Sequence, residues 1–215
     1  MFSCGDRNDR QAPEVEEQLI QTAVRGADYA PQINSEEEKR IYTTALTGLL
    51  KTARDQIALS DKYYSEDVRM LYLKGFFFKS LRELESAQKY FEKAHEISPM
   101  KQQISFELIS TYLQQGKLKE GYDLALATYL SAPEYNASQV IFAVASIYNK
   151  KETEATEILK ERGHNFPGAV PDVINAYLSI RNYAKARALL LEYKRNNPEE
   201  AANVDQLLQQ IDSNR

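Results

Sequence analysis

Four prolines divide the second half of this chain into nearly equal intervals. Pro99, Pro133 and Pro167 lie 34 residues apart, and Pro198 follows 31 residues later. Because proline has no amide hydrogen and restricts the residue before it, we expect each of them to end a helix. A helix-ending signal that returns at a fixed interval indicates an internal repeat, and periods of roughly 20 to 50 residues are typical of solenoids.

The interval that ends at Pro99 has the clearest internal pattern. Counted from Val68, large apolar, small and aromatic residues occupy the positions where two packed helices would meet: Leu71, Gly75, Phe78, Ala87, Phe91 and Ala94. Gly75 lets two helices approach closely, and Ala87 is expected to face it. Phe78 and Phe91 are then expected to fill the space between the two helices.

This pattern resembles that of the tetratricopeptide-repeat (TPR) family, whose unit is a helix-turn-helix of about 34 residues. Lys74 departs from the family pattern, in which Leu usually occupies its position. The resemblance implies an all-α fold, a right-handed superhelical solenoid of about four to five helical pairs followed by a C-terminal capping helix. We see no stretch that reads as a strand.

The repeat array is predicted to span residues 68–200, with units at about 68–101, 102–135, 136–167 and 168–200. The later units keep the pattern in weaker form at Leu108, Tyr112, Gly116, Ala143, Ala155, Leu159, Tyr177, Asn182, Tyr183, Ala186 and Leu190. Gly116 and the Asn182–Tyr183 pair mark turns within units, and Gly121 stands where the family prefers Ala. The loop from Gly163 to Gly168 is predicted to end a helix, with Gly and Asn in left-handed geometry.

The two ends of the chain follow the pattern less closely. Residues 1–12 are predicted to be disordered, residues 13–67 to form a divergent helical pair, and residues 201–215 to form a capping helix. The pair consists of a helix over 13–29, with Val15, Leu19, Ala23 and Ala27 on one face, and a helix opened by a Ser35–Glu38 capping box. The second helix carries an apolar stripe at Leu46, Leu49, Leu50, Ala53 and Ile57. Val204, Leu207, Leu208 and Ile211 form the apolar stripe of the capping helix.

The TPR resemblance also implies a partner-binding groove. In that family the concave wall is lined by the second, fifth, ninth, twelfth and thirteenth residues of each unit. Mapped onto this sequence, these positions are Arg69, Tyr72, Phe76, Lys79 and Ser80; Gln103, Phe106, Ser110, Leu113 and Gln114; Val140, Val144, Ile147 and Tyr148; and Asn175 and Leu178.

The residues at these positions predict the kind of partner. TPR domains that clamp a chaperone's C-terminal carboxylate place Lys, Asn and Arg at the fifth and ninth positions, which are apolar, aromatic or Ser here. We therefore expect no carboxylate clamp. Tyr72, Phe76 and Phe106 instead suggest an apolar, aromatic groove for a helix or an extended segment. The alternative, that some of them pack against the neighbouring repeat, stays open.

Composition excludes several other functions. A net charge of -4, with Lys and Arg interleaved with Asp and Glu, argues against nucleic acid. No apolar run approaches the roughly 18 residues of a membrane-spanning helix. One cysteine and two widely separated histidines, His95 and His164, argue against a metal site or catalysis, and nothing suggests a cofactor. We expect a non-catalytic scaffold for a protein or peptide partner.

Two alternatives concern the setting of such a scaffold. Residues 97–108, 140–148 and 171–177 resemble the TPR region of bacterial O-antigen ligase- or polymerase-like membrane proteins, which would make this chain an appendage of an envelope polysaccharide system. Met1 to Gly5 resemble the end of a lipoprotein signal, in which Cys4 would be lipidated, although the apolar region is missing. The default compartment is the cytoplasm, and the aqueous face of the bacterial envelope is the alternative.

Overall fold

The computed structural model describes residues 35–213, and all regular elements in that range are helices. They are α2 (Glu36–Ser60), α3 (Val68–Ser80), α4 (Leu84–Ile97), α5 (Gln102–Gln114), α6 (Leu118–Ser131), α7 (Asn136–Tyr148), α8 (Glu152–Glu161), α9 (Pro171–Ser179), α10 (Tyr183–Asn196), the short 3-10 helix η1 (Pro198–Glu200) and α11 (Ala201–Ser213). The predicted helix over residues 13–29 and the segment 1–12 lie outside the described residues.

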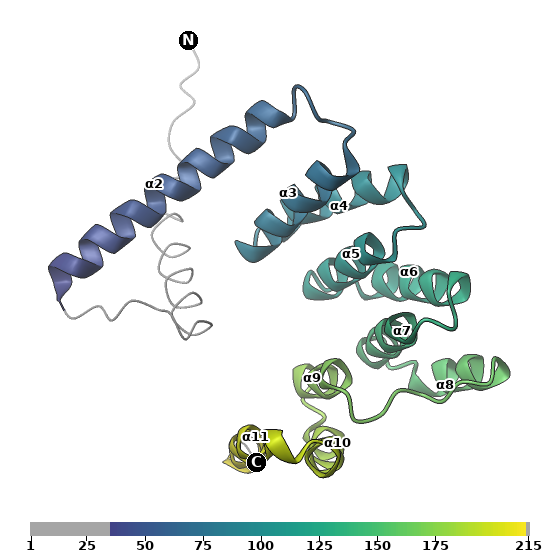
Figure 1. Ribbon diagram of the computed structural model, residues 1–215. Helices are drawn as coiled ribbons and strands as arrows, with labels where there is room; N and C mark the ends of the chain where they lie inside the picture. Colours follow the sequence, from purple (N-terminus) through teal and green to yellow (C-terminus); the bar gives the residue numbers. More distant parts are fainter. Residues whose placement is uncertain (1–34, 214–215) are drawn as a thin grey trace.

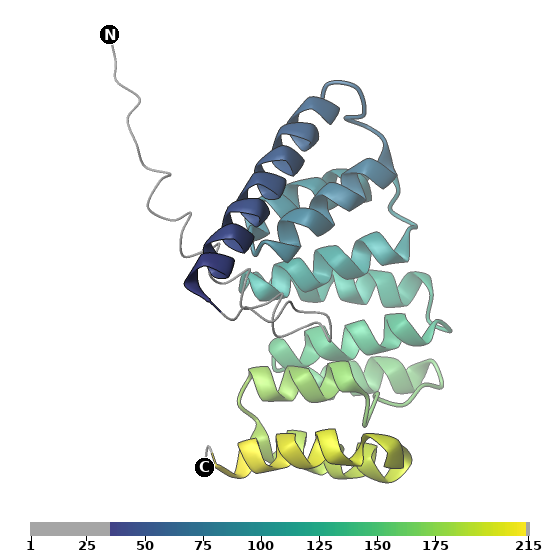
Figure 2. The same ribbon diagram turned by 60° about the vertical axis from the view of Figure 1, so that its left-hand side comes forward.

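Helices α3 to α10 form four successive hairpins that stack one on the next (Figure 1). The first helices of the hairpins gather on one side of the stack, and α4, α6 and α8 lie on the other. A turn of Figure 1 by 60° shows the same ordered stacking from α3 to α11 (Figure 2). The predicted all-α TPR-type solenoid is confirmed.

The turn within each hairpin uses the same backbone geometry. Arg82, Gly116, Lys150 and Arg181 all have positive φ, between 57° and 74°, and recur at the repeat spacing. The left-handed region costs an L-residue about 1 to 2 kcal/mol, whereas glycine adopts it freely. From the sequence we placed this turn at Gly116 in the second unit and at Asn182–Tyr183 in the fourth, where the left-handed residue is Arg181 rather than Asn182.

The first hairpin is closed by the predicted glycine contact. An added Cβ on Gly75 would lie 2.6 to 2.9 Å from ring atoms of Phe91, which is fully buried. Leu71, Ala87 and Ala94 are also buried. Glycine is therefore required at this position, because the Phe91 ring packs directly against the backbone of α3.

Lys74 replaces the family's Leu without leaving the interior. Its side chain is only 2% exposed, and its Nζ lies 2.6 Å from Asp61 Oδ1. The Tyr90 hydroxyl donates to the other oxygen of Asp61 at 2.8 Å. Burial acts to raise the pKa of Asp61, but the hydrogen bonds from Lys74 and Tyr90 outweigh it and hold that pKa below its ordinary value. Burial and, after it, the contact with Asp61 raise the pKa of Tyr90 to about 12.

The prediction that proline ends the second helix is wrong for the third unit. Helix α8 ends at Glu161, six residues before Pro167. The chain leaves it through Gly163, whose φ is +81°, while the amide of His164 donates to the carbonyl of Leu159. A left-handed glycine satisfies the last carbonyls of a helix and stops it without proline.

Helix α2 begins as predicted, and four residues of its predicted apolar stripe are half-buried: Leu46, Leu50, Ala53 and Ile57. The Ser35 hydroxyl accepts the amide hydrogen of Glu38, which fixes its first turn. Helix α2 slants away from the stack (Figure 1), and none of its residues is buried. Leu49, in the predicted apolar stripe, is 69% exposed. Arg54 joins α2 to the array through an ion pair with Glu83.

At the other end, α11 packs against the last hairpin. Val204, Leu208 and Ile211 are buried in one cluster with Ile174 and Leu190, whereas Leu207 is exposed. The predicted stripe is therefore buried at three of its four positions. That α11 serves as the cap of the array remains a proposal.

Candidate functional site

A cavity of about 580 Å³ opens on the side of the stack formed by the first helices. Its walls come from α5, α7 and α9, with one residue of α3 and the N-cap residue Val170 before α9, so all four units contribute. The lining residues are Lys79, Phe106, Glu107, Ser110, Leu113, Gln114, Asn136, Ala137, Val140, Ile141, Val144, Tyr148, Val170, Asp172, Asn175 and Ala176. We call this cavity the groove.

Nine of the sixteen side chains assigned to the concave wall lie in this groove. They are Lys79, Phe106, Ser110, Leu113, Gln114, Val140, Val144, Tyr148 and Asn175. The stacking of the first helices thus brings together side chains that are up to 96 residues apart in the sequence. That they contact a partner remains a prediction.

The other assigned residues lie elsewhere. Tyr72 is half-buried and packs on two core clusters, with its ring centroid 5.9 Å from that of Phe91. Ile147 is fully buried in the largest cluster, so its assignment to the concave wall is wrong. Leu178 is half-buried against the core.

Four further residues assigned to the concave wall are exposed but do not line the groove: Arg69, Phe76, Ser80 and Gln103. Phe76 is 50% exposed. Of the three aromatic residues in the aromatic-groove hypothesis, only Phe106 therefore reaches the cavity.

The floor of the groove is apolar. Leu113 and Val144 are almost fully buried even without a partner, and Val140 and Ile141 are half-buried around them. Phe106 forms part of the wall, where its ring stacks on Tyr135 with centroids 6.2 Å apart and an angle of 12°. Such a surface favours apolar side chains, because water leaves it when a partner covers it.

One wall of the groove carries an ordered polar row. Lys79 Nζ lies 2.6 Å from Glu107 Oε2 and 3.0 Å from Ser110 Oγ, which links α3 to α5. Gln114 Nε2 donates to the same Ser110 oxygen at 3.1 Å. The Lys79 ammonium group is therefore already paired within the chain.

The groove positions assigned from the sequence do not include seven of the residues that line the cavity: Glu107, Asn136, Ala137, Ile141, Val170, Asp172 and Ala176. Glu107, Ile141 and Ala176 each directly follow an assigned position. Asn136 and Ala137 lie in the first turn of α7, and Asp172 lies in that of α9. Asp172 lies nine residues before the left-handed Arg181, as Glu107 and Ile141 lie nine residues before Gly116 and Lys150, and this position was not assigned to the groove in any unit.

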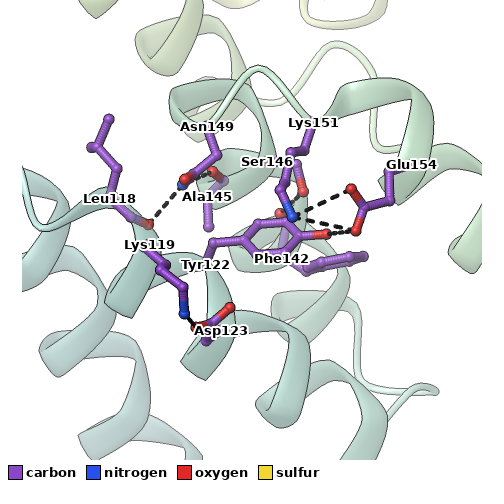
Figure 3. A network of polar contacts seen from close by, with 10 residues as sticks. All are labelled: Leu118, Lys119, Tyr122, Asp123, Phe142, Ala145, Ser146, Asn149, Lys151 and Glu154. Carbon is purple, nitrogen blue, oxygen red and sulfur yellow. Dashed lines mark hydrogen bonds and ion pairs between the residues drawn. The ribbon is translucent and has the colours of Figure 1, made fainter.

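The hairpins behind the groove are joined by polar contacts around Tyr122 (Figure 3). The Tyr122 hydroxyl donates to Glu154 Oε1 at 2.9 Å, and Lys151 Nζ lies 4.2 Å from the centre of its ring. Asn149 Nδ2 donates to the carbonyl of Leu118 at 2.7 Å. Burial, followed by the hydrogen bond to Glu154, raises the pKa of Tyr122. These contacts hold α7, a wall of the groove, against the preceding hairpin.

The next junction repeats this arrangement. The Tyr177 hydroxyl donates to Glu152 Oε2 at 2.5 Å, and Lys185 Nζ donates to the same oxygen at 2.5 Å. Lys185 also lies 5.1 Å from the centre of the Tyr177 ring. A tyrosine, a lysine and a glutamate thus join neighbouring helices at two successive positions, which favours a groove of fixed shape.

The two histidines have structural contacts. His164 Nδ1 lies 2.9 Å from the Tyr129 hydroxyl, and His95 Nδ1 lies 3.3 Å from Ser105 Oγ. Burial lowers the pKa of His95, with the charge of Glu96 acting in the opposite direction. Between residues 35 and 213, no three His, Cys, Asp or Glu side chains are grouped so as to hold a metal ion. None of the helices described is both long and apolar enough to span a membrane.

Comparison with known proteins yields only a likeness in fold. No protein-family model matches the chain, and no curated protein sequence matches it. Among solved structures, "MamA RS-1 ArsTM double mutant" is 14% identical with a TM-score of 0.44, covering 99% of this chain and 98% of its own. PilF of Pseudomonas aeruginosa is 14% identical with a TM-score of 0.48, and the match covers 96% of this chain and 100% of the PilF chain.

These scores are too low to carry an argument about function, and the fold assignment depends on the repeat geometry described above. That geometry defines the class of the protein, an all-α solenoid of TPR-type hairpins. The resemblance to O-antigen ligase- or polymerase-like proteins gains no support from these comparisons.

Proposed function

We propose that this chain is a non-catalytic scaffold that holds a segment of a partner protein in the groove. The observation that carries the proposal is the convergence of nine assigned concave-wall side chains, contributed by four units, on one cavity with an apolar floor. Repeat solenoids present extended concave surfaces of this kind to their partners. An amphipathic helix or an extended segment would cover the floor with its apolar side chains.

The proposal is tested by filling the groove without disturbing the core. Asn175 lines the groove and is exposed, so Asn175→Arg adds a long side chain without burying a charge. Ala184→Arg is the matched control, because Ala184 is exposed on the second helix of the same hairpin. Proteins captured from native lysate by wild type and by each variant are compared by quantitative mass spectrometry, with thermal melting as a check on folding.

We expect wild type and Ala184→Arg to capture at least one common protein. With Asn175→Arg, the captured amount of that protein should fall about tenfold or more, which corresponds to about 1.4 kcal/mol of binding energy. Equal capture by all three forms would show that the groove does not bind the captured proteins. Substitution of Tyr72 by Ala is a less suitable test of the groove, because Tyr72 packs on the core.

Two settings for the scaffold remain predictions from the sequence, an envelope polysaccharide system and a lipid-anchored lipoprotein. The genomic sequence before the codon for Met1 separates them. An in-frame stretch encoding several membrane spans would support the first setting, and a short signal helix ending at Cys4 would support the second.

A further inference from the structure

We infer that the segment held in the groove carries a cationic side chain where it passes the start of α9, next to an apolar face. This inference rests on the proposed function of the groove and names the chemistry of its partner. It follows from the charges that line the groove and from which of them are already paired.

Three lining residues are charged: Lys79, Glu107 and Asp172. Lys79 and Glu107 form an ion pair at 2.6 Å, with side chains that are only 16% and 23% exposed. Their opposite charges cancel, and Ser110 accepts a second hydrogen bond from Lys79. A partner carboxylate would have to displace Glu107 to reach this ammonium group, and the displaced carboxylate would then lack a partner.

Asp172 is different. Its carboxylate is exposed on the groove wall, and no ion pair or hydrogen bond joins it to another side chain or amide within residues 35–213. As the second residue of α9, it interacts favourably with the positive end of the helix dipole. That position leaves the outer oxygens of the carboxylate available for a donor from a partner.

Among the residues that the structure describes, the groove therefore has one uncompensated negative charge beside its apolar floor. Complementary charge across an interface gives specificity and a faster association. A partner with Lys or Arg opposite Asp172 satisfies the carboxylate, and a partner with Asp or Glu at the same place is repelled. Apolar contacts with Val140, Ile141 and Val144 supply affinity for both, so the charge determines which of two otherwise equal segments is preferred.

The test uses three synthetic helical peptides that share one leucine stripe and have acetylated and amidated ends. They carry Lys, Gln or Glu at both ends, so that their orientation in the groove does not matter. Binding of each fluorescent peptide to the full chain is measured by anisotropy at low ionic strength for wild type, Asp172→Lys and Glu157→Lys. Glu157 is the charge-matched control, because it is exposed on the second helix α8 and does not line the groove.

We expect wild type to bind the Lys peptide about threefold to fivefold more tightly than the Glu peptide, the range of an exposed ion pair. Asp172→Lys should reverse this order, and Glu157→Lys should leave it unchanged. Added salt at about 0.5 M should reduce the preference, because exposed charges are screened.

Equal binding of the three peptides, or the same order in wild type and Asp172→Lys, overturns the inference about charge. So does the absence of binding by any peptide at about 1 mM. These results do not decide the proposed function, which has its own test in the lysate experiment. A protein that is captured by wild type and by Ala184→Arg, but lost with Asn175→Arg, supports the groove whatever the charge of its segment opposite Asp172.

Discussion

The buried Lys74 shows how one residue can depart from a repeat pattern and keep the fold. A lysine in an apolar interior is tolerated only when its charge is paired. Asp61, in the loop before α3, supplies the partner and is itself held by Tyr90. The substitution of the family's Leu is therefore compensated by a residue thirteen positions earlier in the chain.

We predict that Asp61→Ala destabilises the protein more than Lys74→Leu does. Removing Asp61 leaves the Lys74 ammonium group buried and unpaired, at a cost of about 2 kcal/mol or more. Lys74→Leu should stay within about 1 kcal/mol of wild type, because an apolar side chain of similar length fills the site. The double variant Asp61→Ala/Lys74→Leu should recover most of the loss. Urea unfolding followed by circular dichroism measures all three, and a double variant no more stable than Asp61→Ala would contradict the explanation.

The same pair gives a pH dependence with a definite sign. The pKa of Asp61 in the folded protein is lower than its ordinary value of 3.8, so its contribution to stability is present above about pH 4. It is lost as the pH falls through the lower, folded value. Between pH 5 and about pH 3, wild type should therefore lose more stability than the Asp61→Ala/Lys74→Leu double variant.

The turns within hairpins offer a second residue-scale test. Lys150 is exposed and has a φ of +57°, in the left-handed region that glycine adopts without cost. We predict that Lys150→Gly changes the free energy of unfolding by less than about 1 kcal/mol, in the stabilising direction. Gly116→Ala, at the equivalent turn with a φ of +74°, should cost about 1 kcal/mol. If both substitutions destabilise equally in urea, the common geometry of the turns is not a source of strain.

At the scale of the helix, two glycines in helical positions have opposite expected effects. Gly75→Ala in α3 places a methyl group against the buried Phe91 ring, and such overpacking costs about 1 to 3 kcal/mol. Gly48→Ala in α2 meets no atom within 4 Å and should increase helix stability by about 1 kcal/mol. Urea unfolding and far-ultraviolet circular dichroism measure both. A stabilising Gly75→Ala would show that the ring can move aside.

Sequence periodicity predicted the helices of this chain better than it predicted what covers them. The proline interval and the small residues of each unit place the hairpins, because these residues are required wherever two helices touch. Helix α8 ends before the loop predicted to begin at Gly163 and not at the proline interval, because Gly163 stops the helix before Pro167 does. The apolar stripe of α2 is half-buried except at Leu49, because a helical pattern shows which face is apolar but not how completely another element covers it.

The sequence also predicted only part of the candidate groove. Positions on the first helices are fixed by the repeat, so most side chains at the centre of the stack fall on the cavity wall as expected. Tyr72 and Ile147 fail for a common reason, since each lies where neighbouring helices cover part of the assigned face. The pairing of Lys79 with Glu107 joins two units, and no pattern within a single unit could show it.

Over the whole molecule, stability should be graded along the solenoid, because each hairpin contacts only its neighbours. The largest cluster of buried residues runs from Ile109 on α5 to Ala186 on α10, whereas α2 buries none. We predict that backbone amides of α5 to α7 exchange slowest with deuterium and that those of α2 exchange fastest, by opening locally. Hydrogen exchange read by mass spectrometry at neutral pH, with peptides covering each helix, measures this gradient. Protection of α2 equal to that of α7 would contradict this gradient.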